Sequence, residues 1–501
     1  MRLGPLLGSC GLAAPPGAAE LEVQRIVYDS RKAGAGSLFV AIPGFHRDGA
    51  RFAADAVARG AVAVVAEAAL AGLSVPVAVT EDARASLADL AAELYDHPTA
   101  RLRVVGVTGT DGKTTTTHLI SDVLEAAGET TGYATTVDFK SAGQSWSNES
   151  RQSTQEAVEV QEFCAELLVA GGTWAVLEAT SHALALQKLR GIWIDVAVFT
   201  NLSPEHLDFH GTFQRYLEAK GLLFEALADG PAKGVEKAAV LNADDPHWRY
   251  LADRVAGARV ITYGLNALAD VQGTVLSADA ESSRIQIAAF GEKTELLLPL
   301  VGRFNVANAL AAAATGLASG ATLAQARTAL ERARAVRGRM ERVAEGQPFT
   351  VIVDYAHTPE ALDNVLALLR PLTPGRLIAV FGSAGERDRA KRPLLAHAAA
   401  RHADLFIITE EDPRLEDPEV ILAEIEAGAR EAGKSLGSDY LVIGDRVAAV
   451  TAAIGRATAG DTVLLAGKGH ERSIITGEVA RPYDEAATAR DALRALGHTK
   501  P

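Results

Sequence analysis

The sequence predicts an α/β fold of three domains with mostly parallel sheets. Short apolar runs, each closed by glycine or a polar residue, alternate along the chain with longer segments of helical period, as in successive βα units. At 501 residues the chain is also too long for one ordinary domain. Its composition, 48% hydrophobic and 22% charged, is that of a globular protein with a sizeable core.

Several apolar runs are typical of buried parallel strands. They occupy residues 104–107, 175–177, 196–199, 351–353, 377–381, 405–408 and 463–465. Parallel sheets carry ligands at the carboxyl ends of their strands, so the residues that follow each run are the first candidates for a site. These residues are Gly109, Glu178, Asn201, Asp354, Gly382, Glu411 and Gly467.

Two candidate linkers divide the chain. His97-Pro98 precedes the run that starts at residue 104, and the arginine-rich stretch 332–339 precedes the run that starts at residue 351. We therefore expect domains at residues 1–97, 98–336 and 337–501.

Charge and cysteine content exclude several classes of protein. A formal net charge of -14 disfavours binding to nucleic acid, because that affinity depends on Lys and Arg. The two cysteines, Cys10 and Cys164, exclude a disulfide scaffold and fit a reducing compartment. We find no signal peptide and no apolar stretch of the roughly 18 residues that a membrane span needs. The sequence therefore predicts a cytoplasmic protein with no nucleic-acid or membrane partner.

Residues 106–115, Gly-Val-Thr-Gly-Thr-Asp-Gly-Lys-Thr-Thr, lie between an apolar strand and an amphipathic helix. In such a loop the glycines let backbone N–H groups approach phosphate, the lysine reaches the outer phosphates and the next hydroxyl binds Mg²⁺. The strict pattern has glycine where Val107 stands, and a glycine-rich turn with a surface lysine is the alternative. We predict that ATP is bound by Gly109, Thr110, Asp111, Gly112, Lys113, Thr114 and Thr115.

The loop resembles the phosphate loop of the Mur ligases and of their folate-polyglutamate relatives. Further stretches resemble the same family in the same order, and together they cover nearly the whole chain. They are residues 29–31, 36–41, 178–184, 200–208, 210–211, 242–245, 302–308, 338–341, 354–359, 387–393 and 467–471. The Asp-Ser-Arg stretch at 29–31 and the Gly-Lys-Gly-His-Glu stretch at 467–471 are most similar to the muramoyl-tripeptide synthetase (MurE) branch.

The resemblance implies a UDP-binding N-terminal domain, a central phosphate-loop ATPase domain and a C-terminal Rossmann-like domain that holds an amino acid. It also implies an ATP-dependent ligase of peptidoglycan precursor synthesis. Such an enzyme adds a diamino acid to the D-Glu of UDP-MurNAc-L-Ala-D-Glu through an acyl phosphate. Its partners would be the UDP-MurNAc-dipeptide and the diamino acid, and we expect a monomer.

Activating a carboxylate as an acyl phosphate depends on positioning and on neutralising charge. The resemblance implies that Glu178 and His206 bind Mg²⁺ with Thr114, and that Lys220 reacts with CO₂ to form a carbamate. A carbamate would turn a cation into an anionic ligand for Mg²⁺. From the residues alone, Glu178 could be a solvated acid and Lys220 a surface lysine. The expected catalytic residues are Lys113, Glu178, His206 and Lys220.

Other nucleotide contacts are implied by the resemblance alone. Asn305 and Arg339 match positions that hold the base and the phosphate, and Asp354 and His357 match contacts that reach the phosphate from the third domain. A structural turn before Pro359 is the alternative for that last pair.

The acceptor substrate is assigned in the same way. The resemblance implies nucleotide contacts from Tyr28, Ser30, Phe45, His46 and Arg47, and a muramoyl-dipeptide path along Gln152, Ser153, Thr154, Thr180 and Lys188. The family usually has Thr-Thr-Pro at 153–155, Ser at 180 and Arg at 188. A lysine lacks the planar two-point contact that arginine makes with a carboxylate, and Arg190 could substitute for it.

The amino-acid specificity loop is expected at Glu411, Asp412, Pro413 and Arg414, where relatives that add diaminopimelate typically show Asp-Asn-Pro-Arg. Arg414 remains available to bind a carboxylate. The negative charge of Asp412 should suit a terminal ammonium and penalise a second carboxylate. L-Ornithine and L-lysine are therefore alternatives to meso-diaminopimelate as the amino acid that is added, and the choice among the three stays open. Arg387, Gly467 and Glu471 complete the expected pocket, and Glu471 is expected to receive an amino group, with a solvated loop acid as its alternative.

Two rival functions share part of this pattern. A ligase of the folylpolyglutamate synthetase type would share the phosphate loop and the Mg²⁺ site, but it would not need the Asp-Ser-Arg domain. A non-catalytic phosphate-loop regulatory module would be expected to carry an Asn-Lys-x-Asp element, and the sequence has none.

Overall fold

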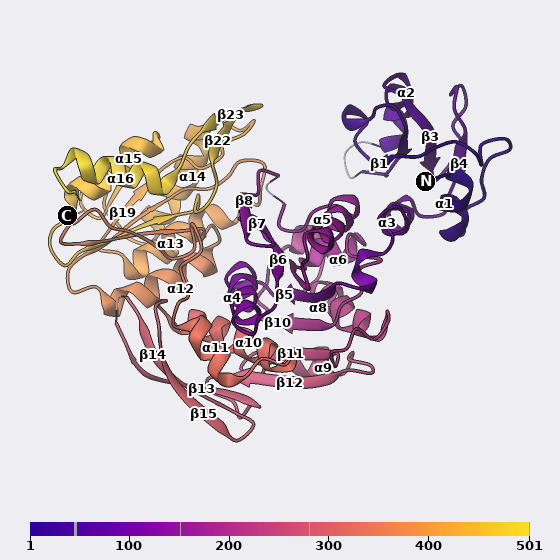
Figure 1. The fold of residues 1–501 in the computed structure, drawn as a ribbon. Helices are drawn as coiled ribbons and strands as arrows, with labels where there is room; N and C mark the ends of the chain where they lie inside the picture. Colours follow the sequence, from indigo (N-terminus) through magenta and orange to yellow (C-terminus); the bar gives the residue numbers. More distant parts are fainter. Residues whose placement is uncertain (45–47, 151, 280, 500–501) are drawn as a thin grey trace. The chain divides into compact units, whose positions relative to one another are not determined.

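The computed structural model describes residues 1–44, 48–150, 152–279 and 281–499 (Figure 1). The chain forms two units. One comprises Met1–Gly273, Ile287–Thr294 and Ala307–Ala329, and the other comprises Thr274–Gln286, Glu295–Val306 and Leu330–Pro501. Within the described ranges, no helix has both the length and the apolarity that a membrane crossing requires.

The first sheet of the chain is parallel, with strand order β1-β2-β3-β4. Its strands are β1 (Arg25–Val27), β2 (Ser37–Val40), β3 (Ala61–Ala66) and β4 (Val77–Val79). The helices of this region are α1 (Leu3–Ser9), α2 (Ala53–Ala58) and α3 (Ala83–Leu94), with the 3-10 turns η1 (Ser30–Lys32), η2 (Gly49–Phe52) and η3 (Pro98–Ala100). Asp82 starts α3 because its carboxylate accepts the backbone N–H groups of Arg84 and Ala85.

A second sheet has the order β15-β14-β13-β12-β11-β10-β5-β9-β6-β7-β8. Its first strands are β5 (Arg103–Thr108), β6 (Thr131–Ala134), β7 (Asp138–Ser141), β8 (Gln144–Ser147), β9 (Trp174–Glu178) and β10 (Val196–Phe199). The others are β11 (Ala238–Asn242), β12 (Arg259–Gly264), β13 (Val271–Ala278), β14 (Ser283–Ala289) and β15 (Glu292–Leu298). Pairing is parallel from β6 through β9, β5, β10 and β11 to β12, whereas β6, β7 and β8 pair antiparallel.

The helices that accompany this sheet in the sequence are α4 (Lys113–Ala126), α5 (Ala157–Val169), α6 (Ser181–Ala185), α7 (Leu207–His210), α8 (Phe213–Glu225), α9 (Trp248–Ala252), α10 (Arg303–Ala318) and α11 (Leu323–Leu330), with the turn η4 (Ala226–Ala228). Every residue of β9, β10 and β11 is buried, because helices cover both faces of a parallel sheet. Trp174 of β9 is the largest fully buried side chain among the residues that the structure describes.

The third sheet has the order β16-β17-β21-β18-β19-β20 and is parallel apart from β16. Its strands are β16 (Glu341–Val343), β17 (Thr350–Asp354), β18 (Leu377–Phe381), β19 (Leu405–Ile408), β20 (Tyr440–Val442) and β21 (Thr462–Ala466); β22 (Ser473–Thr476) and β23 (Val479–Pro482) form a separate hairpin. Its helices are α12 (Pro359–Leu369), α13 (Lys391–His402), α14 (Pro418–Glu431), α15 (Arg446–Arg456) and α16 (Glu485–Ala495), with the turn η5 (Arg370–Leu372).

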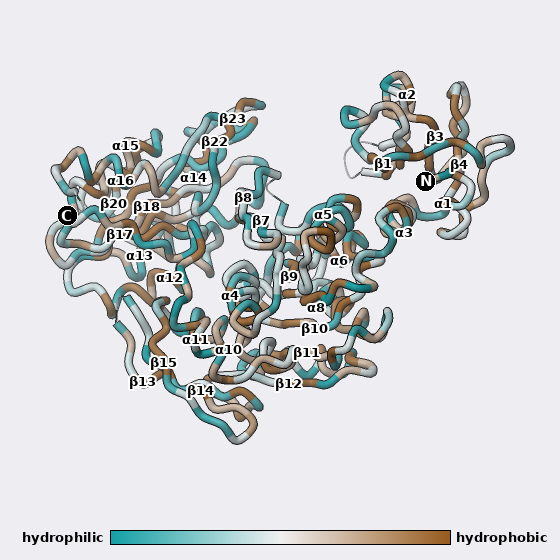
Figure 2. The backbone as a smooth tube through the Cα atoms, in the orientation of Figure 1, coloured by the Kyte–Doolittle hydropathy of each residue, from teal (hydrophilic) through white to brown (hydrophobic). Residues whose placement is uncertain are grey.

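The apolar runs noted in the sequence are strands in the structure. Figure 2 shows long hydrophobic stretches along β10 and β18, and both strands are fully buried. The predicted α/β class with mostly parallel sheets is confirmed, whereas the domain boundaries at 97/98 and 336/337 stay a prediction. Sequence analysis did not anticipate the antiparallel hairpins β7–β8 and β22–β23.

Candidate functional site

The predicted phosphate loop joins β5 to α4. Gly109 has φ 151° and Gly112 has φ 82°, which are conformations that favour glycine. A Cβ on Gly109 would lie 1.8 Å from Thr200 Oγ1, and a Cβ on Gly112 would lie 2.4 Å from Asn308 Oδ1. Glycine is therefore favoured at both positions, because the backbone φ is positive and because a neighbouring side chain occupies the place of a Cβ.

The end of β10 holds this loop in place. In the parallel register, Phe199 of β10 is the partner of Thr108 of β5, so the residues that follow each strand are neighbours. Asn201 accepts the Thr110 N–H through its carbonyl (2.8 Å) and the Asp111 N–H through its side chain (2.9 Å). Lys113 Nζ donates to the carbonyls of Gly109 (3.0 Å) and Thr110 (2.7 Å), so the lysine lies over its own loop.

Glu178, the last residue of β9, faces the first turn of α4. Its carboxylate accepts hydrogen bonds from Thr114 Oγ1 (2.7 Å), the Thr136 N–H (3.0 Å) and Thr136 Oγ1 (2.9 Å). The residue is 1% exposed. The structure therefore brings the predicted pair Thr114 and Glu178 together. It also adds Thr136, which no sequence motif had indicated.

Lys220 of α8 is buried beneath the same loop. Its Nζ donates to the Gly109 carbonyl (2.7 Å) and lies 4.5 Å from the centre of the Tyr216 ring. Burial, with the nearby charge of Lys113, holds the pKa of Lys220 well below its usual range. The interpretation of Lys220 as a surface lysine is excluded by this position.

His206 precedes α7 with a left-handed backbone, φ 57°. Its Nε2 lies 3.5 Å from a carboxylate oxygen of Glu205, and its ring meets that of His182 edge-on, with centroids 4.6 Å apart. Burial lowers the pKa of His206, and the charges of Lys113 and Lys220 act in the same direction. His206 therefore belongs to the same neighbourhood as the phosphate loop.

The donors of this neighbourhood suit Mg²⁺, because a hydroxyl and a carboxylate are hard oxygen ligands and lie side by side at Thr114 and Glu178. Within the described part of the chain, no three His, Cys, Asp or Glu side chains are grouped as a metal site. The predicted Mg²⁺ ligands instead combine a hydroxyl (Thr114), a carboxylate (Glu178), an imidazole (His206) and a lysine (Lys220).

The predicted dipeptide path adjoins Glu178. Thr154 Oγ1 donates to the Glu178 carbonyl (2.8 Å) and lies 3.2 Å from Thr180 Oγ1. Lys188 Nζ donates to Gln152 Oε1 (3.0 Å), which draws two more of the predicted residues together. Ser153, between Gln152 and Thr154, is half-buried. Four of the five predicted residues are thus linked in pairs.

Arg190 does not join this group, because its guanidinium pairs with Asp89 of α3 at 2.7 Å. Lys188, which stands where the family has arginine, pairs through its Nζ with Glu156 Oε1 at 2.7 Å. The structure therefore gives no support to Arg190 as a substitute for the family's arginine.

Of the five residues predicted to contact the UDP-sugar nucleotide, the structure describes Tyr28 and Ser30. Tyr28 Oη donates to Glu159 Oε1 of α5 (2.8 Å), and Ser30 is buried at the start of η1. Asp29 caps that turn and holds the Arg31 guanidinium. Phe45, His46 and Arg47 lie outside the described residues.

Asp354, Arg339 and His357 lie in the second unit. The Asp354 carboxylate accepts the backbone N–H groups of Met340 and Ala356, both at 2.8 Å. The Arg339 guanidinium lies 4.6 Å from the centre of the Tyr355 ring, and His357 Nδ1 lies 2.9 Å from the Tyr355 carbonyl oxygen.

Asn305 belongs to the same unit and donates to the Val301 carbonyl at 2.9 Å. The turn expected before Pro359 is a helix cap, because Thr358 Oγ1 accepts the Ala361 N–H and proline occupies the first turn of α12.

The expected amino-acid pocket follows β19 and β21. Glu411 is 7% exposed, and within the described residues its Oε2 has no hydrogen-bond partner. A Cβ on Gly467, whose φ is 102°, would lie 2.9 Å from that oxygen. Arg414 has φ 55° and pairs through its backbone with Ile475 and Gly477. The pocket is therefore tied to the β22–β23 hairpin.

The charge of Asp412 is compensated within the protein. Asp412 Oδ1 accepts from Lys468 Nζ (2.8 Å) and from the Ile475 N–H (3.0 Å). Lys468 also pairs with Glu471. Burial raises the pKa of Glu471, although Lys468 opposes the shift. Arg387 is exposed on the loop after β18, and Gly385 of the same loop donates its N–H to the Asp412 carbonyl (2.8 Å).

Lys468 and Arg446 are buried cations of this unit for which no role was predicted. Lys468 stood within the Gly-Lys-Gly-His-Glu stretch, so a signal was available. Arg446, at the start of α15, donates to the carbonyls of Glu410 (3.1 Å) and Ala466 (2.6 Å) and pairs with Glu485 (2.8 Å). It thus holds the residues that precede Glu411 and Gly467, and no motif points to it.

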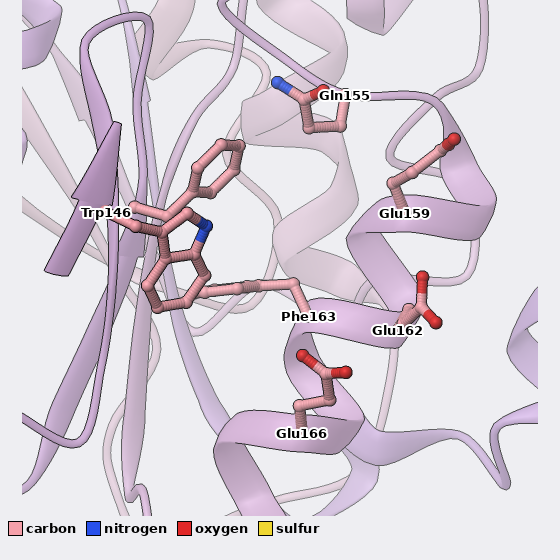
Figure 3. A pocket seen from close by; sticks show the side chains of 7 residues that line it. Trp146, Gln155, Glu159, Glu162, Phe163 and Glu166 are labelled. Carbon is pink, nitrogen blue, oxygen red and sulfur yellow. The ribbon is translucent and has the colours of Figure 1, made fainter. Parts of the chain in front are cut away.

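A separate hollow of about 320 Å³ lies between the β7–β8 hairpin and α5 (Figure 3). Its lining residues are Phe139, Trp146, Gln155, Glu159, Glu162, Phe163 and Glu166. Among the predicted site residues none lines it, so it is distinct from the phosphate loop.

The fold and these residues define a nucleotide-binding protein of the α/β class, with a phosphate loop in one unit and a mostly parallel, Rossmann-like sheet in the other. Residues 22–98 match the Mur ligase family catalytic domain, residues 107–316 the Mur ligase middle domain, and residues 338–469 the Mur ligase glutamate ligase domain.

Relatives match along the whole chain. The UDP-N-acetylmuramyl-tripeptide synthetase of Roseiflexus sp. is 51% identical, over 95% of this chain and 96% of the relative. The UDP-N-acetylmuramoyl-L-alanyl-D-glutamate–2,6-diaminopimelate ligase of Solibacter usitatus is 41% identical, over 99% of both. A solved structure of a ligase with the latter name has a TM-score of 0.68 and 31% identity, and the match covers 100% of both chains. The chain belongs to the Mur ligase family and is an ATP-dependent ligase.

Proposed function

We propose that this chain joins a diamino acid to the D-Glu carboxylate of UDP-MurNAc-L-Ala-D-Glu through an acyl phosphate, as a cytoplasmic monomer in peptidoglycan precursor synthesis. Its domains would be residues 1–97 for the UDP-sugar, 98–336 for ATP and 337–501 for the amino acid. The rival folate-type and regulatory functions lose their support, because full-length relatives bear the names of tripeptide ligases.

One observation carries the proposal. Glu178 binds Thr114 of the phosphate loop through its carboxylate and Thr154 of the dipeptide path through its carbonyl. One residue therefore links the predicted γ-phosphate site to the predicted acceptor site. Forming an acyl phosphate needs those two groups within reacting distance, and most of the rate gain comes from such positioning.

Each residue then has a role in the reaction. Lys113 would neutralise the outer phosphates, and Thr114, Glu178 and His206 would hold Mg²⁺, which supplies charge neutralisation when bound. Lys188 would meet the acceptor carboxylate. Lys220, buried against the Gly109 carbonyl, would add CO₂ through its neutral amine with release of a proton, and the resulting carbamate would serve as an anionic ligand for Mg²⁺.

The first test is direct synthesis. Purified protein is incubated with ATP, Mg²⁺ and UDP-MurNAc-L-Ala-D-Glu, with L-ornithine, L-lysine and meso-diaminopimelate supplied separately, while product mass and phosphate release are followed. We expect a tripeptide with one dominant amino acid. No product with any of the three would refute the proposal.

Thr154→Val sharpens this test, because valine keeps the shape of threonine and loses the hydroxyl that binds Glu178. We expect slower product formation with ATP affinity unchanged. The carbamate is tested separately with ¹³C-bicarbonate: a labelled carbamate signal should be present in the native protein and absent in Lys220→Met.

A further inference from the structure

Lys468 joins the two segments that form the expected amino-acid pocket. It is 0% exposed, and its ammonium contacts Asp412 of the specificity loop and Glu471 of the Gly-Lys-Gly-His-Glu stretch. An ammonium without solvent is tolerated only when anions surround it. The lysine is therefore part of the pocket's charge balance and not a surface group.

Asp412 is buried and engaged by groups of the protein itself. The residue is 3% exposed, and a single carboxylate oxygen accepts from both Lys468 Nζ (2.8 Å) and the Ile475 N–H (3.0 Å). The reasoning from sequence treated Asp412 as a negative charge presented to the amino acid. In the structure that charge anchors the loop against a cation.

We propose that Lys468 is a positioning residue that sets amino-acid specificity: it neutralises Asp412, so that the aspartate does not repel a second carboxylate on the incoming diamino acid. This inference rests on the proposed function. With Lys468 present, the charge of Asp412 is offset by an ammonium that Asp412 shares with Glu471. Without Lys468, the same aspartate would be an unpaired anion beside the pocket.

Glu411 is the carboxylate left to receive an amino group. Its Oε2 is buried and has no hydrogen-bond partner among the described residues, and Gly467 packs close to that oxygen, where an added Cβ would lie 2.9 Å away. A buried acceptor in that condition gains most from a charged donor. Selection by charge is thus divided between Glu411, which attracts an ammonium, and Lys468, which prevents Asp412 from doing the same.

The test compares kcat/KM for meso-diaminopimelate and L-ornithine in four proteins: the native chain, Lys468→Met, Asp412→Asn and the double variant. An amino acid that is not a substrate is measured by its Ki as a competitive inhibitor. Lys468→Met should disfavour diaminopimelate relative to ornithine by about tenfold or more, because a desolvated like charge is strongly repulsive. Asp412→Asn should move the ratio the other way.

The double variant is the decisive arm, because removing both charges should return the ratio to within about threefold of the native value. If Lys468→Met does not fold, the double variant and Asp412→Asn still give the comparison, and equal ratios in those two would overturn the proposal. Lys233→Met is the matched control, since the Lys233 side chain is 2% exposed and pairs with Asp195 outside the expected pocket. It should leave the ratio unchanged.

Equal losses with both amino acids in Lys468→Met, without rescue in the double variant, would mean a structural role only. That outcome differs from failure of the proposed function, in which the native protein itself forms no tripeptide.

Discussion

Replacing Glu178 should separate its structural role from its catalytic role. Its carboxylate accepts three hydrogen bonds at 2.7, 3.0 and 2.9 Å in a fully buried place. Glu178→Ala removes all three and leaves the Thr136 N–H without an acceptor. A bond to a charged group contributes about 1.5–3 kcal/mol, and the threonine hydroxyls can turn to other acceptors. We therefore expect a loss of about 3 kcal/mol in the free energy of unfolding.

Glu178→Gln should cost much less, about 1 kcal/mol, because its amide oxygen can accept the Thr136 N–H and its amide nitrogen can donate to the Thr136 hydroxyl. The negative charge is nevertheless lost. Product formation should fall at least about 100-fold, since charge neutralisation at the phosphates is the main contribution to this type of catalysis.

Thermal melting and product formation over a range of Mg²⁺ concentrations distinguish the two effects. For a domain of this size, a loss of about 3 kcal/mol corresponds to a fall of about 6–12 °C in melting temperature for Glu178→Ala. Glu178→Gln should melt close to the native protein and be inactive. A glutamine variant with the native rate and the native Mg²⁺ dependence would refute the reasoning.

Three further predictions concern other parts of the chain. Burial lowers the pKa of His470 to about 2. Below about pH 6.5 the unfolded chain therefore takes up a proton that the folded chain does not, and the free energy of unfolding should decrease as the pH is lowered. His470→Gln should flatten that fall in melting temperatures measured from about pH 7 to 4. Gly112→Ala should weaken ATP binding in calorimetry at least about tenfold, because φ is 82° and the new Cβ would lie 2.4 Å from an α10 side chain. Asp195→Ala should cost about 3–5 kcal/mol in chemical denaturation, because it leaves the buried ammonium of Lys233 unpaired.

Each of these predictions has a matched control or a result that contradicts it. Gly128→Ala has a similar backbone, φ 92°, and open space, so it should leave ATP binding unchanged. A His470→Gln variant that keeps the native slope with pH would contradict the role given to burial. Asp195→Ala with native stability would show that water or another anion reaches Lys233.

The parallel strands and the phosphate loop were predictable because their signals are local. An all-apolar run such as that of β18 is buried on both faces whatever it packs against, and Gly109 and Gly112 meet a backbone requirement within a few residues of Lys113. The hairpin β7–β8 escaped prediction because its strands are partly exposed and lack such runs.

The side-chain contacts within the candidate site could not be predicted from the sequence. Thr136 binds Glu178 from 42 residues away, and Lys468 binds Asp412 from 56 residues away. Neither spacing has a period that a sequence pattern could show. Sequence analysis therefore named Asp412 but assigned its charge to the ligand and not to Lys468.

The sequence by itself determined the α/β class, the nucleotide loop and, through the resemblance, the family to which this chain belongs. Those properties depend on residue type and short-range spacing. Only the tertiary structure decided which carboxylates of the expected amino-acid pocket are paired with a cation, because the net effect of a buried carboxylate depends on the cation packed against it. Asp412 has Lys468 beside it, whereas Glu411 Oε2 has no hydrogen-bond partner among the described residues, so two carboxylates of the same chemistry differ in their surroundings.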